Sequence, residues 1–171
     1  MNLIASIVAA ALWFAAQHEA MPRGMSHEEH LEQMEKERAL KKRGADAMGF
    51  DQEATTHHFS LRPDGGAIEV IVKAGTDAAL VAEVRNHLRS IASEFARGNF
   101  DTPFQTHAEV PPGVSTMQKR SSAISYRYED LPLGGVVRIA TKDARALDAV
   151  HEFLRYQITE HRTGDPLEVK R

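Results

Sequence analysis

The chain contains no cysteine in its 171 residues. This absence excludes disulfide bonds, thiolate metal sites, thiol catalysis and lipid attachment through an N-terminal cysteine. An excess of basic residues is also lacking, because 21 Lys and Arg stand against 24 Asp and Glu, for a formal net charge of −3. Nucleic-acid binders usually carry a basic stripe for the phosphates, so we expect no nucleic-acid partner. Any bound metal ion must use His, Met or carboxylate ligands.

Motifs of the common enzyme classes are missing too. The sequence has no G-x-S-x-G nucleophile elbow, no G-x-x-x-x-G-K-[ST] phosphate loop and no G-x-G-x-x-G strand–helix junction. Acid–base pairs such as Glu69 and His58 can be drawn, but their spacing defines no reaction. The sequence therefore favours a non-catalytic protein and indicates no catalytic residue.

The first 20 residues predict an export signal. Residues 3–16 are uncharged and mainly apolar, too short to span a bilayer comfortably but of the length of a signal-peptide core. We expect a periplasmic or secreted protein, cleaved between Ala15 and Ala20, that meets a membrane only through this segment. No Lys or Arg precedes the apolar run, so an uncleaved anchor or a buried terminal helix remains the alternative.

Residues 21–48 form a polar block that predicts a helix. Ser26 and Glu29 make a capping box at its start, and Gly44 is expected to end it. The apolar stripe of this helix is thin, so the helix either packs lightly on the domain or acts as a tether.

The same block concentrates soft metal ligands. His27, His30 and Met34 share one helical face by their three- and four-residue spacing, and Met21, Met25 and Met48 lie nearby in sequence. Thioether and imidazole together suit copper, above all Cu(I), and copper is the cofactor we expect. The alternative is that these are solvated histidines, with methionine present as a good helix former.

Residues 49–171 predict one α+β domain built from two similar halves, 55–98 and 121–162. Each half reads as strand, turn, strand and helix, and Gly65-Gly66 aligns with Gly134-Gly135. The expected strands cover residues 55–61, 67–73, 123–128 and 136–140, and the expected helices are capped by Thr76 and Thr141. Two ββα repeats should form a four-stranded antiparallel sheet with both helices on one face.

The linker 99–120 is long for a compact domain. Such a connection is often functional or carries its own structure, and Pro112 could begin a short helix through Arg120. His107 and Met117 are its potential ligands, although a plain crossing loop is the alternative. The tail from Thr163 is expected to be loose.

His57 and His58 are adjacent on a strand, so their side chains point to opposite faces and cannot share one ion. We expect His57 inside and His58 outside, and a buried histidine with one hydrogen-bond partner is the alternative to a ligand. A domain site would combine one of them with His107 and His151, with Met117 as a soft supplement. The candidate metal ligands are therefore His27, His30, Met34, His57, His58, His107, Met117 and His151.

The open sheet face offers a competing site for a small anionic ligand or a protein. The side chains expected there are those of His58, Ser60, Glu69, Arg127 and Arg138. Cross-strand charge pairs on a solvated sheet explain the same pattern without a ligand. The sequence thus favours an exported metal-binding protein, with a non-catalytic interaction or anion-binding module, using this face or the 99–120 loop, as the alternative.

Five segments together, MGFDQEATTHHF, VPPGVSTM, ISYRYED, VHEFLRYQITEH and RTGD, resemble a family of small exported bacterial proteins of unassigned function. The resemblance covers about residues 21–165 and implies an exported single domain. Some relatives carry an aspartate carbamoyltransferase label, which the motifs here do not support. The chain is much shorter than those enzymes and lacks their Ser-Thr-Arg-Thr loop and their His-Pro-x-Gln motif.

Overall fold

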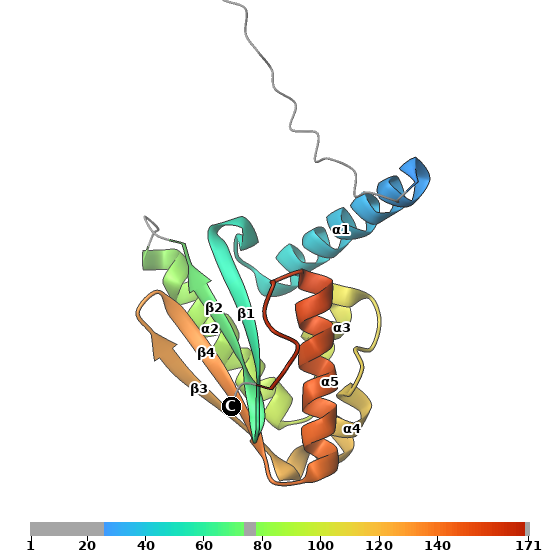
Figure 1. The fold of residues 1–171 in the computed structure, drawn as a ribbon. Helices are drawn as coiled ribbons and strands as arrows, with labels where there is room; N and C mark the ends of the chain where they lie inside the picture. Colours follow the sequence, from blue (N-terminus) through green and yellow to red (C-terminus); the bar gives the residue numbers. More distant parts are fainter. Residues whose placement is uncertain (1–25, 74–77, 170–171) are drawn as a thin grey trace, which may run out of the picture. The chain divides into compact units, whose positions relative to one another are not determined.

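A computed structural model describes residues 26–73 and 78–169 of the chain (Figure 1). The apolar run at 3–16 and the expected helix cap Thr76 lie outside these residues. The chain divides into two compact units, Met1–Glu35 and Lys36–Arg171. Within the described residues, no helix has both the length and the apolar character needed to cross a membrane.

Helix α1 spans His27–Met48 and begins as expected. Ser26 Oγ accepts from the amide of Glu29 at 3.2 Å, and the Glu29 carboxylate accepts from the amide of Ser26 at 2.8 Å. The prediction that Gly44 ends this helix is wrong. A Cβ at Gly44 would lie 2.7 Å from the Gln52 side chain, so the glycine permits close packing, and the chain leaves the helix only before Gly49, whose φ is +72°.

Four antiparallel strands form the sheet in the order β1-β2-β4-β3. They are β1 (Thr55–Arg62), β2 (Gly65–Val72), β3 (Ile124–Leu131) and β4 (Gly134–Thr141). The expected strands are confirmed, but both hairpins are tighter than the sequence suggested, because the paired glycines belong to the strands. Each glycine pair lies where another chain segment crosses closely: a Cβ at Gly66 would lie 2.2 Å from Leu154, and one at Gly135 would lie 3.1 Å from Leu88.

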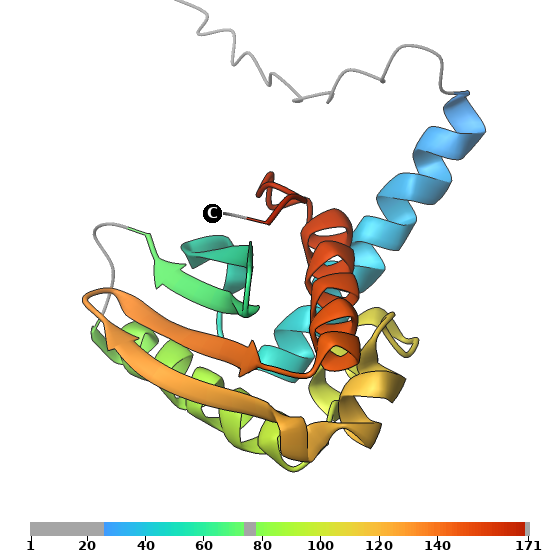
Figure 2. The ribbon, with the colours of Figure 1, turned by 60° about the horizontal axis from the view of Figure 1, so that its bottom comes forward.

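Two long helices pack on the sheet and share one hydrophobic core with it, and each covers the hairpin further from it in sequence. Helix α2 (Ala78–Ala96) packs mainly on β3 and β4, as Figure 2 shows, whereas α5 (Ala144–His161) packs mainly on β1 and β2. The expected cap Thr141 is wrong for α5. Asp143 caps this helix by accepting from the Ala146 amide at 2.8 Å, while the Thr141 hydroxyl donates to the carbonyl of Ala123.

The connection between the halves is mostly helical. It contains α3 (Asp101–His107), which the sequence reading missed, and α4 (Val114–Lys119), which matches the short helix expected after Pro112. Single 3-10 turns precede β1 and β3, at Gln52–Ala54 and Ser121–Ala123. Because α4 packs on α5, the linker is part of the core rather than a free loop.

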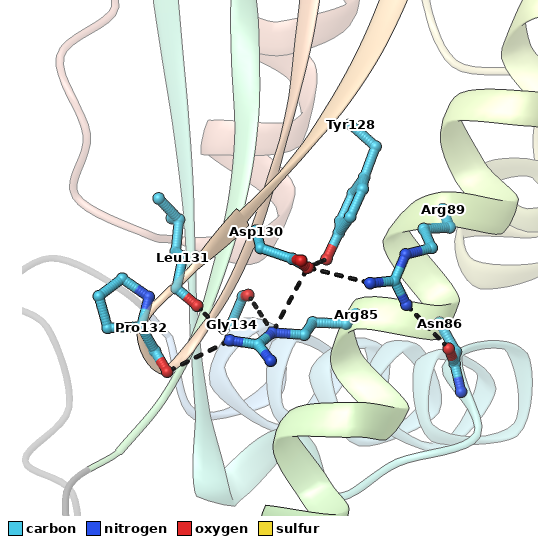
Figure 3. A network of polar contacts seen from close by, with 8 residues as sticks. All are labelled: Arg85, Asn86, Arg89, Tyr128, Asp130, Leu131, Pro132 and Gly134. Atoms are coloured by element: carbon cyan, nitrogen blue, oxygen red, sulfur yellow. Dashed lines mark hydrogen bonds and ion pairs between the residues drawn. The ribbon is translucent and has the colours of Figure 1, made fainter.

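One side chain from each long helix binds the ends of the opposite hairpin. Arg85 of α2 donates to the carbonyls of Leu131 and Gly134, the residue pair that flanks the β3–β4 turn, at 2.6 and 3.0 Å (Figure 3). His151 of α5 lies 2.9 and 3.0 Å from the carbonyls of Arg62 and Gly65, the pair that flanks the β1–β2 turn. Carbonyls only accept, so His151 donates through Nε2.

Asp130 binds the side chains of Arg85, Arg89 and Tyr128. Figure 3 places its carboxylate between the Tyr128 hydroxyl and the guanidinium groups of Arg85 and Arg89. These bonds lower the pKa of Asp130, chiefly through the Tyr128 hydrogen bond. The cluster stabilises the β3–β4 hairpin against α2 at a partly exposed site.

The tail after α5 is anchored, which contradicts the expected loose end. Asp165 accepts from the backbone amide of Phe59 at 2.8 Å, from the Thr163 hydroxyl at 2.7 Å and lies 3.1 Å from His58 Nδ1. Edge strands leave backbone amides unpaired, and here the RTGD segment satisfies one of them.

Candidate functional site

Four histidines from four different elements line one cavity of about 60 Å³. They are His57 of β1, His87 of α2, His107 of α3 and His161 of α5. The remaining wall is mainly apolar, with Phe59, Phe95, Phe153 and the thioether of Met48. We call this cavity the histidine pocket.

Three of the rings are neighbours. The centroids of His107 and His161 are 5.0 Å apart with the rings nearly perpendicular, and those of His57 and His161 are 6.2 Å apart with the rings nearly parallel. The Phe50 ring also stacks on His57, and it meets His87 edge-on with the ring centroids 5.4 Å apart. The local reason for this gathering is that each histidine continues the buried stripe of its own strand or helix.

Burial keeps the histidines of the pocket neutral. It lowers the pKa of His57 and of His87 to about 4 and that of His161 to about 3. The neighbouring rings add to the effect on His57 and His161, because a second positive charge in the pocket would be repelled. Burial also lowers the pKa of His107. At neutral pH the pocket therefore presents uncharged imidazoles.

His107 and Gln157 leave polar atoms unused. Both side chains are more than nine-tenths buried, with 8% and 5% of their surface exposed. His107 Nε2 lies 3.0 Å from the side-chain oxygen of Gln157, but His107 Nδ1 and Gln157 Nε2 are buried with no hydrogen-bond partner. Buried polar atoms are nearly always paired in native proteins, so two orphans in one pocket suggest a missing ligand.

A second, outer cavity of about 500 Å³ adjoins the histidine pocket. His57 and His161 line both cavities, and the outer one is also lined by Glu53, Glu160 and Lys73. Glu160 lies 3.6 Å from Lys36, with 22% of its side chain exposed. A polar solute can therefore reach the two histidines from a charged vestibule.

The other candidate ligands lie elsewhere. His58 points to the open side of the sheet and binds Asp165, His151 is occupied by hairpin carbonyls, and Met117 is fully buried in the apolar core. None of these three lines the histidine pocket. His27, His30 and Met34 lie on α1 in the first unit, where His27 is exposed and the other two are half-buried.

The sequence predicts His57 and His107 as ligands, but it does not predict that His87, His161 and Gln157 line the same pocket. Their positions carried a signal: His87 follows Val84 by three residues, and both Gln157 and His161 follow buried positions of the α5 stripe, Leu154 and Ile158, by three. Within residues 26–73 and 78–169, no three His, Asp or Glu side chains converge tightly enough to hold an ion as they stand.

The open sheet face brings together four of the five residues expected there. His58, Ser60, Glu69 and Arg138 line a shallow cavity of about 700 Å³, and Arg127 lies directly across from Arg138 on β3. Two of these side chains already have acidic partners within the protein. Arg138 donates to Glu129 at 2.9 Å, and Asp165 holds His58.

Comparisons with protein-family models, with curated proteins and with solved structures found no match to this chain.

Proposed function

We propose that this protein binds a transition-metal ion, copper first, in the histidine pocket, with His57, His107 and His161 as ligands. One observation carries the proposal: neighbouring imidazoles from three elements line one cavity, and His107 has a buried ring nitrogen with no partner there. The charged vestibule beside His57 and His161 supplies an entry route.

The spacing of the rings is compatible with a shared ion. Metal–nitrogen bonds of about 2 Å place the ring centroids of two imidazoles on one ion roughly 5–6 Å apart. The observed separations are 5.0 Å for His107–His161 and 6.2 Å for His57–His161. Because the donor atoms do not yet converge, binding requires the rings of His57 and His161 to turn about their side-chain bonds.

Protonation does not compete with binding at neutral pH. An imidazole must be deprotonated to ligate a metal, and burial lowers the pKa of all three proposed ligands. Copper is favoured over zinc because Met48, a thioether residue, is among the described residues that line the cavity, and no Asp or Glu is. Thioether and imidazole ligands suit Cu(I).

The test is a Cu(I) titration of the purified protein against a chromophoric chelator, with the ion content measured by mass spectrometry. We expect one ion per chain, and an affinity at least about tenfold lower when His107→Gln or His161→Gln removes a ligand. His58→Gln is the matched control, because His58 neighbours His57 in sequence but faces the other side of the sheet.

A second pair of variants separates the pocket from helix α1. His27→Ala and Met34→Leu should leave binding unchanged; loss of the ion in these variants instead would place it on the helix and overturn the pocket assignment. Failure of the wild-type protein to retain a stoichiometric ion at neutral pH would overturn metal binding altogether.

The open sheet face gives less support to anion binding. Arg138 already forms an ion pair with Glu129, and His58 is already in contact with Asp165, so an incoming carboxylate or phosphate would have to displace a bound carboxylate.

Two further parts of the proposal concern origin and location. We propose that the ββα segments are copies of one duplicated unit with both helices on one sheet face, supported by the matched use of Arg85 and His151 on opposite hairpins. We also propose export to the periplasm or beyond, supported by the apolar run at residues 3–16.

A further inference from the structure

The side-chain amide of Gln157, in the histidine pocket, is hydrogen-bonded through its oxygen but not through its nitrogen. It lies on α5, one turn before His161, and 5% of its surface is exposed. Its oxygen contacts His107 Nε2 at 3.0 Å, and its nitrogen is buried without a partner.

The bonded side fixes the tautomer of His107. An amide oxygen can only accept, so the proton lies on Nε2 of His107. A second proton on Nδ1 would create a buried charge with no partner, which is costly. Nδ1 therefore carries a bare lone pair. Metal-bound histidines commonly donate their other ring N–H to an oxygen in this manner, which fixes both tautomer and ring orientation.

The unpaired amide nitrogen of Gln157 indicates that a second small species binds beside the ion. The amide nitrogen carries two N–H donors, and leaving a buried donor unsatisfied is unfavourable. The cavity of about 60 Å³ has room for more than one small species, because a single water needs only about 10–15 Å³. The donor thus calls for a hydrogen-bond acceptor inside the pocket.

We propose that Gln157 sets the chemistry of the pocket: its oxygen holds His107 as a ligand through Nδ1, and its free N–H donates to a small acceptor, a water or an anion, bound to the ion. The proposal rests on the proposed function for the ion, but the tautomer of His107 can be measured without any metal.

The first test uses the metal-free protein and nitrogen-15 NMR of the imidazole rings. We expect His107 protonated on Nε2 in the wild type. Gln157→Glu keeps an oxygen acceptor and should keep that tautomer, whereas Gln157→Leu should give a mixture of the two. A His107 that is protonated on Nδ1 in the wild type, or unaffected in Gln157→Leu, would overturn this half of the proposal.

The second test uses the Cu(II)-loaded protein and azide as the probe anion. A saturable azide-to-copper absorption band would identify an anion site. In azide-free buffer, electron–nuclear double resonance would identify a bound water by exchangeable protons coupled to copper more strongly than the remote N–H of a bound imidazole. In either case Gln157→Glu and Gln157→Leu should both lower the affinity of the ion for the azide or the water by about tenfold, because neither side chain supplies the amide N–H.

The outcomes keep the two proposals apart. If the wild type retains no copper, the proposed function fails while the tautomer result still stands or falls by itself. If copper binds but neither azide nor an exchangeable proton is detected, or if both Gln157 variants bind azide as tightly as the wild type, the role of the free N–H is refuted.

Discussion

Acid is expected to unfold this protein well above the pH at which its carboxylates titrate. The perturbation is a change from pH 7 to pH 5. His57, His87 and His161 have native pKa values of about 4, 4 and 3, against about 6.5 in an unfolded chain. A lowered pKa on a base means that the native state binds fewer protons than the unfolded state. Stability is then fully present above about pH 6.5 and is lost as the pH falls toward the native values.

The magnitude follows from linkage. At pH 5 the unfolded chain gains up to about 2 kcal/mol from protonating each of these three imidazoles, or on the order of 6 kcal/mol in total. A domain of this size has a free energy of unfolding of about 5–15 kcal/mol, so the loss is a large part of the whole. The lowered pKa of His107 acts in the same direction.

The assay is urea unfolding followed by circular dichroism at several pH values in metal-free buffer. His87→Phe keeps an aromatic ring against Phe50 and should remove about 2 kcal/mol of the pH dependence. His27→Gln, a change at an exposed helix position, should leave it intact. A change in the free energy of unfolding below about 1 kcal/mol between pH 7 and pH 5 would refute the account of the pocket as a set of buried neutral imidazoles.

Two further predictions concern the scaffold. Arg85→Met removes the donors to the Leu131 and Gly134 carbonyls and should lower the free energy of unfolding, measured in urea, by about 1–3 kcal/mol. Arg89→Met removes only an exposed ion pair with Asp130 and should cost clearly less. Equal costs would contradict the role of Arg85 in holding the β3–β4 turn. Met117 is fully buried outside the pocket, so Met117→Ala should cost about 2–5 kcal/mol and Met117→Leu under about 1.5 kcal/mol, both with unchanged copper binding. Weakened copper binding in a stably folded Met117→Leu variant would show that its sulfur is a ligand.

The regular elements could be predicted because their evidence is local. Alternation over β2 and the three- and four-residue spacing of α2 and α5 depend only on which side of one element is buried. Helix α3 was missed because it has only seven residues and carries Pro103 inside it. The predicted cap of α5 lies two residues before the observed one, because Thr and Asp are both favourable at this position. Thr141 is paired with β3 as the last residue of β4, which leaves Asp143 as the cap.

The site could be predicted only in part. Strand alternation predicts that His57 points inward and that the adjacent His58 points to the opposite face of the sheet. The partners of His57 could not be found in this way. His151 and His161 both flank the buried stripe of α5, so the sequence alone does not distinguish them. The structure shows that His151 Nε2 is already bonded to the carbonyls of Arg62 and Gly65.

The sequence by itself determined the alternating strands, the amphipathic helices and the absence of thiol chemistry, because each depends on neighbours a few residues apart. The tertiary structure decided which histidines meet. Helix α5 crosses to β1 and β2 rather than to its own hairpin, which brings His161 to a strand residue, His57, more than a hundred positions earlier. Such a contact depends on how whole elements pack to bury their apolar faces, and no local pattern specifies it.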